Sequence, residues 1–326
     1  MSTDDSVAAG RELVWSLSLR YGCEPPMKNV LQLEPAGDGL LVRAPAKINL
    51  SLLIAGKRPD GFHEIETVMA KVDWFDEIRI EPADTTEIEF ACQGPCWAPA
   101  DRTNLVYRAA ELILRTCGRP GNVKLTLTKN IPAGSGLGSG SSDAATTLLG
   151  LNTYLNLGLS QSQLMDLAAQ LGSDVAFFLN GPLALCTGRG EKISALSTRF
   201  DFTAVLILPN TNSSTKEVYA HYRHDPVLYQ QLKSRTTAFL EKNRLDLLAG
   251  MCANMLESGC FHRYEELGDL KEAVRMLGLG PVCLSGSGST MFCLLDPVAG
   301  EQVEHVREII ADRTGCGSVV VRNNEW

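Results

Sequence analysis

The most regular pattern in the chain is an alternation of apolar and polar positions over residues 42–54. Apolar side chains occupy the even-numbered positions of this run, whereas Lys47, Asn49 and Ser51 stand at odd-numbered ones. Because successive side chains of a strand point to opposite faces, the pattern predicts a half-buried β-strand with one polar face. The three polar side chains are therefore expected on the same side of the strand.

Turn and strand signals continue after this run. The Arg-Pro-Asp-Gly sequence at residues 58–61 favours a tight turn, since Pro fixes φ and Gly permits positive φ. A strand-like run at residues 65–72 then completes a predicted hairpin. A third alternating run, residues 123–128, leads into a segment rich in Gly and Ser, and apolar residues recur at helical spacing from Ala144. The Gly-rich segment is therefore predicted to lie between the end of a strand and the beginning of a helix.

The rest of the chain has a mixed pattern of helices and strands. A capping-box pattern at Ser160 and Gln163 predicts a helix over residues 160–171, with Gly172 at its C-terminal end. Further predicted segments are a strand at residues 202–208, a helix at 264–277, strands at 281–284 and 290–295, a helix at 300–313 and a strand at 317–321. This second half therefore has the pattern of an α+β domain.

Length and composition indicate a folded protein of about two domains. The chain has 326 residues, of which 44% are hydrophobic, and this excludes a mainly disordered or collagen-like protein. We predict an N-terminal extension at residues 1–40, to which no function is assigned, a first domain at residues 41–200 and a second at residues 201–326.

Charge and cysteine content argue against several partners and locations. The net charge of −8 and the pI of about 5.3 disfavour binding of nucleic acid or an anionic membrane through a general basic field. The uncharged stretch between Asp143 and Asp166 contains nine Ser, Thr, Asn and Gln residues, so it is predicted to be a soluble element rather than a membrane span. Ten scattered Cys without a CxxC pair, and no secretory segment at the start, favour reduced thiols in the cytoplasm.

Charged residues are scarce over residues 130–188. Although 21% of the chain is charged, this stretch contains three charged residues, Asp143, Asp166 and Asp174. So few charges predict a stretch that is mostly buried or wrapped around a ligand. Asp166 falls on the side of its predicted helix away from the apolar stripe, so it is predicted to be a solvated surface charge.

The Gly-rich segment has the features of an anion-binding loop. Gly134, Gly136, Gly138 and Gly140 lie two residues apart, directly before a helix that opens with two Ser residues. Small residues let the backbone approach a ligand closely, and the free N–H groups at a helix N-terminus favour an anion. The spacing matches neither a Walker A motif nor a Rossmann fingerprint. A flexible Gly/Ser linker remains the alternative interpretation.

We predict that this loop binds phosphate groups. The predicted contacts are Pro132, Ala133, Gly134, Ser135, Gly136, Leu137, Gly138, Ser139, Gly140, Ser141 and Ser142. A second run of small residues, 285–290, lies between two apolar strand-like segments. Alone it fits a plain tight hairpin as well, but two such loops in one acidic protein are more easily explained by a shared phosphorylated ligand.

These pieces, in their order along the chain, resemble the GHMP kinase superfamily, the small-molecule kinases for galactose, homoserine, mevalonate and phosphomevalonate. The matching motifs are PAKINL at residues 45–50, PAGSGLGSGSSDAA at residues 132–145 and LSGSGSTMF at residues 284–292. The resemblance covers roughly residues 41–321. Ser135 and Ser139 stand where the family usually has Gly, a change that affects loop flexibility but keeps the backbone donors.

Other local features resemble one branch of this superfamily. They are APAKINL at residues 44–50, RPDGFHEIET at residues 58–67, GSDVAFF at residues 172–178 and STKEVY at residues 214–219. This branch uses ATP to phosphorylate the 2-hydroxyl of a cytidine-diphosphate-linked (CDP-linked) methylerythritol in the non-mevalonate route to isoprenoid precursors.

The resemblance implies an α+β fold with two domains. The N-terminal domain is expected to be like domain 2 of ribosomal protein S5 and the C-terminal domain to be ferredoxin-like, with the active site in the cleft between them. ATP and Mg²⁺ are implied as cofactors, and a monomer or a homodimer as the assembly.

The resemblance also assigns the catalytic residues. It makes Asp174 the acceptor of the hydroxyl proton, with Lys47 beside it, since a nearby ammonium stabilises an ionised carboxylate. Asn49 is placed near the reacting end of the substrate. From position alone, Asp174 could instead cap the short segment at residues 175–179, and Lys47 could be a solvated charge on an exposed strand.

Acceptor recognition follows from the same resemblance. The predicted contacts are Asn49, Phe62, His63, Thr215, Tyr219, Gly286 and Gly288. Phe62, His63 and Tyr219 are expected to hold the cytosine end by stacking and hydrogen bonding, with Thr215 as a polar contact. A structural role for His63 and a core position for Tyr219 are the alternatives.

No dedicated metal cage is visible in the sequence. Mg²⁺ usually keeps several waters and binds through substrate phosphates with one or two protein groups. Asp143 and Ser142 are candidates for metal or phosphate contact, and a favourable position of Asp143 at a helix N-terminus is the alternative. His221 and His224 have i, i+3 spacing without a third ligand, so they are predicted to be surface residues.

Two other functions remain open at this point. One is another small-alcohol kinase of the superfamily, of the homoserine or mevalonate type, which the segments at residues 58–63 and 214–219 argue against. The other is a non-catalytic protein that senses a nucleotide or another ligand with the same fold. The presence of both Lys47 and Asp174 argues against it.

Overall fold

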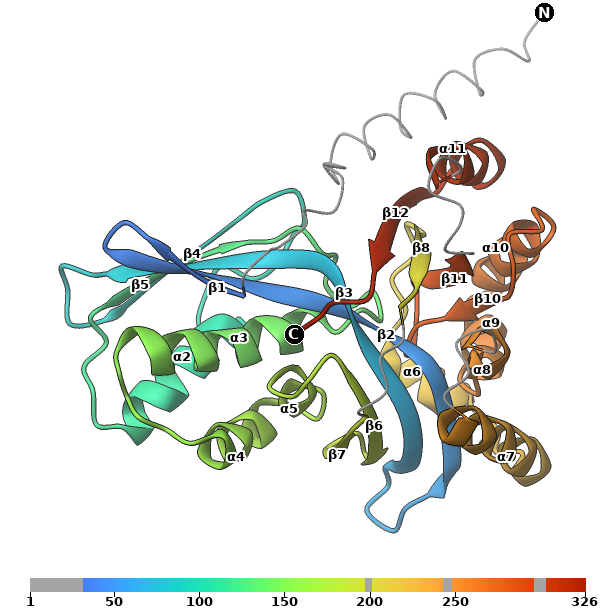
Figure 1. The fold of residues 1–326 in the computed structure, drawn as a ribbon, viewed down its shortest axis with the longest axis horizontal. Helices are drawn as coiled ribbons and strands as arrows, with labels where there is room; N and C mark the ends of the chain where they lie inside the picture. The colour runs from blue at the N-terminus through green and yellow to red at the C-terminus, as the bar shows by residue number, and fades with distance from the viewer. Residues whose placement is uncertain (1–31, 197–200, 243–247, 296–302) are drawn as a thin grey trace, which may run out of the picture.

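The computed structural model describes residues 32–196, 201–242, 248–295 and 303–326. These residues form an eight-stranded sheet and a four-stranded sheet, each with helices packed against it (Figure 1). Most of the extension predicted at residues 1–40 lies outside the described residues, as do the last residues before the predicted domain boundary and the start of the helix predicted at residues 300–313.

The larger sheet is built on a long hairpin. Its strands are β1 (Leu33–Ala36), β2 (Gly39–Lys57), β3 (His63–Pro82), β4 (Ile88–Gln93), β5 (Val123–Thr128), β6 (Leu183–Gly188), β7 (Lys192–Ala195) and β9 (Ala253–Asn254). Strands β2 and β3 pair antiparallel over almost their whole length. At their turn Gly61 has a φ of +87° and the Arg58 N–H donates to Phe62 O (2.7 Å), which confirms the predicted hairpin.

Four helices cover one face of this sheet. They are α2 (Leu105–Thr116), α3 (Ser139–Tyr154), α4 (Gln161–Leu171) and α5 (Val175–Phe178). Ser160 and Gln163 exchange side-chain hydrogen bonds with each other's backbone at the start of α4, so the predicted capping box is confirmed. Apolar side chains of the helices and the sheet form one core. This core fixes the start of α3, where the Gly-rich loop ends.

The polar face of β2 is buried rather than exposed. Lys47, Asn49 and Ser51 are 3%, 4% and 1% exposed, so the prediction of a half-buried strand is wrong. The Lys47 N–H donates to Leu137 O of the Gly-rich loop (2.9 Å), and the Asn49 N–H donates to Ser285 Oγ of the second small-residue loop (3.4 Å). The two loops therefore cover the face that the alternation left for solvent.

The smaller sheet has a ferredoxin-like topology. Its strands are β8 (Thr203–Leu208), β10 (Val282–Leu284), β11 (Met291–Leu295) and β12 (Gly317–Arg322), and the helices of this half are α6 (Thr215–His221), α7 (Pro226–Lys242), α8 (Leu248–Met251), α9 (Glu257–Arg263), α10 (Glu265–Arg275) and α11 (Val303–Thr314). The order β10-β11-β8-β12 is antiparallel throughout. Helices follow β8, and α11 follows β11, as in a split βαβ fold. The predicted ferredoxin-like half is confirmed.

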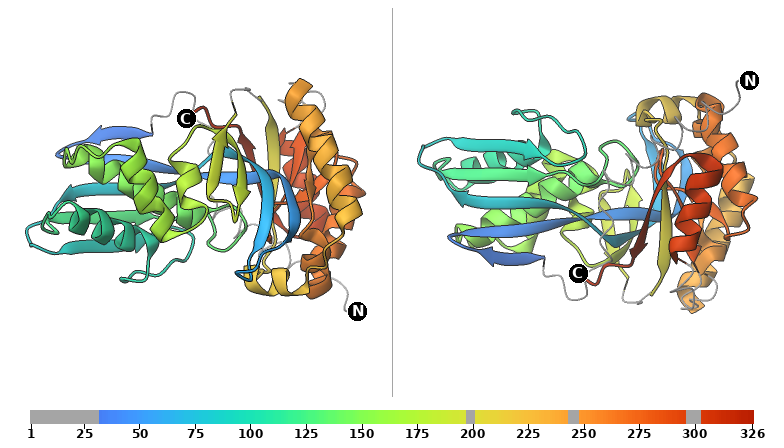
Figure 2. Two further views of the ribbon diagram at one scale, coloured as in Figure 1. Left: turned by 90° about the horizontal axis from the view of Figure 1, so that it is seen from below. Right: turned by 90° about the horizontal axis from the view of Figure 1, so that it is seen from above.

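The long hairpin connects the two halves of the molecule. Leu52 and Ile65, near the hairpin turn, belong to the same core as Val205 and Ile207 of β8. Strand β9, from the second half of the chain, pairs with β2 in the larger sheet. Figure 2 shows the hairpin running from one half to the other. The division of the chain at residue 200 stays a prediction.

Several other predictions can be compared with the described residues. Asp166 is exposed on α4, as predicted. The chain from 130 to 188 is mostly buried or half-buried, also as predicted. Among the described helices none has the length and apolar content needed to cross a membrane. Nine cysteines within the described residues are free thiols.

Candidate active site

The two small-residue loops lie against each other. The Thr290 N–H donates to Ser135 O (3.0 Å), and Ser285 Oγ donates to Gly136 O (2.9 Å). Gly136 has a φ of +83°, and a Cβ at this position would lie 2.1 Å from Ser285 O, so the contact requires glycine. The Gly-rich segment is packed on both sides, and the flexible-linker interpretation is therefore wrong.

Lys47 joins strand β2 to the Gly-rich loop. Its Nζ donates to Asn49 Oδ1 (2.6 Å) and to Gly136 O (2.8 Å). Burial lowers the pKa of Lys47, and the nearby Asp174 carboxylate opposes this effect. The interpretation of Lys47 as a solvated surface charge is therefore wrong, because the ammonium is buried between a strand and a loop.

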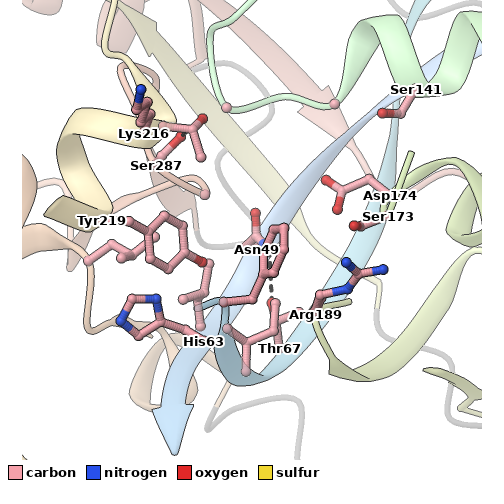
Figure 3. Close-up of a pocket in the computed structure, with 18 of the residues that line it drawn as sticks. Asn49, His63, Thr67, Ser141, Ser173, Asp174, Arg189, Lys216, Tyr219 and Ser287 are labelled. Atoms are coloured by element: carbon pink, nitrogen blue, oxygen red, sulfur yellow. Dashed lines mark hydrogen bonds between the residues drawn. The ribbon is translucent and has the colours of Figure 1, made fainter. Parts of the chain in front are cut away.

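Asn49 is held by its own chain of hydrogen bonds. Its Nδ2 donates to Thr67 Oγ1 (2.8 Å), and that hydroxyl donates to Ser51 O (2.6 Å) (Figure 3). The amide therefore keeps its oxygen toward Lys47. Thr67, on the neighbouring strand β3, was not predicted from the sequence as a site residue.

Asp174 directly precedes helix α5, and its side chain is turned to the pocket. It occupies the N-cap position of α5, but its carboxylate accepts no capping hydrogen bond from the described residues. Figure 3 shows the carboxylate beside Ser173, facing the open space in front of Asn49. The capping interpretation is not supported, so the carboxylate is available to a ligand.

Aromatic side chains gather at the other end of the pocket. The His63 and Tyr219 rings lie 5.0 Å apart, and the ring of Phe62 is 54% exposed. Burial, followed by the charges of Lys57 and His224, lowers the pKa of His63 and thereby favours its neutral form. These residues come from the β2–β3 turn and from α6, and they offer flat apolar surfaces for stacking.

One pocket of about 890 Å³ connects these groups. The predicted site residues that line it are Lys47, Asn49, Phe62, His63, Gly134, Gly136, Gly138, Ser139, Gly140, Ser141, Asp174, Thr215, Tyr219 and Gly286. The Thr215 hydroxyl is within 2.7 Å of the Ser287 hydroxyl, which joins α6 to the second loop. Tyr219 therefore lies at the pocket wall and not solely in the core.

Six predicted residues lie outside the set of described residues that line the pocket. They are Pro132, Ala133, Ser135, Leu137, Ser142 and Gly288. The Ser135 hydroxyl donates to Pro132 O (2.7 Å), which shapes the loop from within. The Ser142 N–H donates to Gly138 O (2.9 Å), and its fully buried hydroxyl has no hydrogen-bond partner among the described residues. Gly288 packs against Leu284 and Ser213.

Asp143, a candidate for metal contact, instead forms a closed ion cluster beneath the loop. Lys129 Nζ donates to Asp143 Oδ2 (2.7 Å) and to Asp76 Oδ2, and the three side chains are at most 3% exposed. Asp76 Oδ1 also accepts the N–H groups of Asn130 (2.6 Å) and Ile131 (2.8 Å). Burial raises the pKa of Asp143. The cluster anchors the start of the loop, and neither interpretation of Asp143 anticipated it.

A metal would have few protein ligands here. The described residues contain no group of three His, Cys, Asp or Glu side chains suited to a metal ion. His221 is half-buried and His224 is exposed. The lining offers the Asp174 carboxylate and the Ser141 hydroxyl. This donor set fits a Mg²⁺ ion that is carried mainly by nucleotide phosphates.

Sequence reasoning missed several lining residues. Those outside every predicted contact include Lys57, Thr67, Ser173, Arg189, Lys216 and Ser287. All of these except Arg189 adjoin or lie inside recognised motifs, so the motif boundaries could have indicated them. Arg189 has no such signal, because the turn between β6 and β7 reaches the pocket only through the fold.

Comparison with known proteins gives a consistent result. Residues 104–182 match the family model described as GHMP kinases N terminal domain, and residues 237–308 match GHMP kinases C terminal. The chain is 39% identical to the 4-diphosphocytidyl-2-C-methyl-D-erythritol kinases of Geobacillus sp. (strain WCH70) and Bacillus subtilis (strain 168). Each comparison covers 78% of this chain and 88% of the relative. The chain belongs to the GHMP kinase family.

Solved structures also support the assignment of this chain to the GHMP kinase family. A crystal structure of 4-(cytidine 5'-diphospho)-2C-methyl-D-erythritol kinase superposes with a TM-score of 0.70 and 33% identity, over 87% of this chain and 99% of that one. The homoserine kinase from Cytophaga hutchinsonii shares the fold. It superposes with a TM-score of 0.69 and 21% identity, over 91% of this chain and 98% of that one. The protein is thus a phosphotransferase of this family, for which ATP is the expected phosphate donor.

Proposed function

We propose that this kinase transfers the γ-phosphoryl group of ATP to the 2-hydroxyl of 4-diphosphocytidyl-2-C-methyl-D-erythritol, in the non-mevalonate route to isoprenoid precursors. The single observation that carries the proposal is the shared pocket. In Figure 3 Asp174 lies on one side of this pocket and His63 and Tyr219 lie on the other, and the Gly-rich loop and Phe62 also line it. A long acceptor with a nucleobase at one end and a reactive hydroxyl at the other matches this arrangement.

Phosphoryl transfer needs in-line positioning and stabilisation of phosphate charge more than it needs strong base catalysis. Asp174 orients the attacking hydroxyl and accepts its proton late in the reaction. The Gly-rich loop and the start of α3 present backbone N–H groups to the phosphates of ATP. The loop is fixed by its contacts with Lys47 and Ser285, so these donors are positioned before ATP arrives.

Lys47 contributes a positive charge next to the reacting groups. Its hydrogen-bond partners, Asn49 and Gly136, are neutral. Among the described residues no carboxylate lies within 4 Å of this buried ammonium. Burial lowers its pKa in the absence of a ligand. Phosphate oxygens would compensate that burial and favour the charged form. Lys47 therefore binds the transferring phosphoryl group more strongly as negative charge develops there.

Mg²⁺ is proposed as the accompanying metal. When bound, it would neutralise phosphate charge, and Asp174 and Ser141 are the protein groups that could hold it. We also propose a cytoplasmic protein, as the free cysteines and the sequence favour. A monomer or a homodimer remains the prediction for its assembly.

The experiment is an acceptor competition with purified protein, ATP and Mg²⁺. ADP formation is measured by a coupled assay with 4-diphosphocytidyl-2-C-methyl-D-erythritol, homoserine or mevalonate, singly and together. We expect turnover of the CDP-linked acceptor alone. A higher kcat/KM with homoserine or mevalonate would contradict the proposed substrate, and tight nucleotide binding without turnover of any acceptor would indicate a ligand-sensing protein.

A further inference from the structure

The pocket lining is rich in cationic side chains, of which Lys47 alone has a role in the proposed phosphoryl transfer. Lys47, Lys57, Arg189 and Lys216 line it, and Asp174 is the one acidic side chain among the described lining residues. The protein as a whole has a net charge of −8. A local cationic lining in an acidic protein favours anionic ligands. The proposed acceptor carries a diphosphate between its two ends, and this group needs a partner.

Arg189 is held at the pocket by a structured turn. It lies between β6 and β7, where its N–H donates to Glu191 Oε2 (2.6 Å) and the Gly190 N–H donates to Thr187 O (3.1 Å). Its guanidinium carbon lies 4.7 Å from the centroid of the Phe62 ring. Backbone contacts therefore fix the turn, while the side chain extends to the aromatic end of the pocket.

The guanidinium of Arg189 keeps its donors available. Among the described residues it forms no ion pair within 4 Å and no side-chain hydrogen bond. A guanidinium that lies over a ring uses its flat face, whereas its N–H groups point outward in its plane. Those groups match two phosphate oxygens in a bidentate geometry that Lys cannot reproduce. Arg189 can therefore stack on Phe62 and bind an anion at once.

The position of Arg189 suits the middle of the acceptor. Its guanidinium lies near the Phe62 ring, and in the same turn a Cβ added to Gly190 would lie 3.6 Å from Asp174 Oδ1. Figure 3 shows Arg189 below Asp174 and Ser173, across the pocket from Tyr219. Two of the other cations fit less well, because Lys47 Nζ is engaged by the loop and Lys216 points away from Asn49 and Asp174 in Figure 3.

We propose that Arg189 binds the diphosphate of the CDP-linked acceptor and thereby selects a nucleoside diphosphate over a plain small alcohol. The proposal rests on the proposed function for the identity of the acceptor. The diphosphate is held midway between the base stack at Phe62 and the hydroxyl at Asp174. A homoserine- or mevalonate-type acceptor lacks this group, so Arg189 contributes nothing to its binding.

The experiment compares the variants Arg189→Gln and Arg189→Lys with Lys192→Gln, an exposed cation on β7 that does not line the pocket. Steady-state kinetics give kcat and KM for each substrate, and calorimetry gives Kd for two probes, CDP and cytidine. Hydrogen bonds to charged groups contribute about 1.5–3 kcal/mol, or roughly 10–100-fold in affinity. We expect KM for the acceptor and Kd for CDP to rise by about this factor in Arg189→Gln.

Cytidine separates a diphosphate contact from simple support of Phe62. We expect its Kd to be unchanged in Arg189→Gln, with KM for ATP also unchanged and kcat within about threefold, because the lost contact is made equally in the ground and transition states. Arg189→Lys should recover part of the CDP affinity. Equal weakening of cytidine and CDP, or no change in either, would overturn the proposal, as would an equal effect of Lys192→Gln.

The outcome for Arg189 is distinguishable from the outcome for the proposed function. If the native enzyme does not phosphorylate the CDP-linked acceptor, the proposed function fails, and the binding of CDP against cytidine still tests Arg189. If the native enzyme is active and Arg189→Gln keeps both its KM and its CDP affinity, the inference about Arg189 alone is wrong.

Discussion

Lys129 and Lys47 are both buried beside the phosphate loop, but their surroundings differ. Lys129 lies beneath the loop against two carboxylates, Asp76 and Asp143, in a cluster closed to solvent. Burial lowers the pKa of Lys129, but the two carboxylates outweigh burial and leave that pKa raised. Lys47 lies at the pocket wall with neutral partners, and burial leaves its pKa lowered.

The difference shows how one buried cation can be structural and another functional. A lysine whose charge is already compensated by carboxylates gains little from a bound anion. A lysine that is buried without such compensation gains a favourable partner when phosphate arrives. The closed cluster of Asp76, Lys129 and Asp143 therefore supports the loop, whereas Lys47 acts on the ligand.

The largest expected effect comes from breaking the closed cluster. Lys129→Met leaves Asp76 and Asp143 buried without a cation, so we expect a loss of about 3–5 kcal/mol in the free energy of unfolding. Thermal and urea unfolding measure this loss. Lys124→Met is the control, since Lys124 is an exposed residue of β5 and its loss should cost less than about 0.5 kcal/mol. Similar stability of the two variants would contradict a supporting role for the cluster.

A second test concerns the contact between the two loops. In Gly136→Ala the new Cβ would meet Ser285 O, and the φ of +83° disfavours a side chain, so we expect a cost of about 2–4 kcal/mol and a lower kcat/KM for ATP. Gly134→Ala is the matched control. The φ of Gly134 is +71°, but no described atom lies within 4 Å of the new Cβ. We therefore expect this variant to lose about 1 kcal/mol in the free energy of unfolding. Equal effects of both substitutions would show that the loops need not touch.

A third buried lysine, Lys71, extends the comparison. Its Nζ donates to Phe178 O (3.0 Å), at the end of α5, and to Asn180 O (2.6 Å), and no described carboxylate lies within 4 Å. Burial lowers its pKa to about 7, from 10.5. Between these two values the unfolded chain binds more protons than the folded one, so stability increases as pH rises.

Lys71→Met should remove this pH dependence. We expect the free energy of unfolding of the native protein to gain about 2 kcal/mol more than that of the variant between roughly pH 6.5 and 8.5. Urea unfolding at several pH values measures the two slopes. Parallel slopes would mean that Lys71 is charged in the fold throughout this range, like Lys129.

Local signals in the sequence predicted much of the fold. Strand β2, the turn before Phe62 and the capping box at Ser160 are each set by a few neighbouring residues, and each forms where the sequence predicts it. The burial of β2 on both faces could not be predicted, because the covering loops come from distant parts of the chain. Periodicity reports which side chains share a face, but not what later packs against that face.

The candidate site was predictable where motifs carry its chemistry. Lys47, Asp174 and the aromatic residues near His63 all reach the pocket as the family resemblance implied. The ion partners of Asp143 were not predictable, since Asp76 is far away along the chain and nothing local links them. Arg189 was missed for the same reason.

The most direct test of the account is the activity of Asp174→Asn, which keeps the shape of the side chain and removes its charge. A positioned proton acceptor contributes about 10²–10⁴-fold, so we expect kcat with the CDP-linked acceptor and ATP to fall by at least about 100-fold. The melting temperature should stay within about 2 °C of the native value, because the carboxylate makes no capping bond to the described chain. A variant that folds normally and keeps more than about a tenth of the native kcat would contradict the role of Asp174.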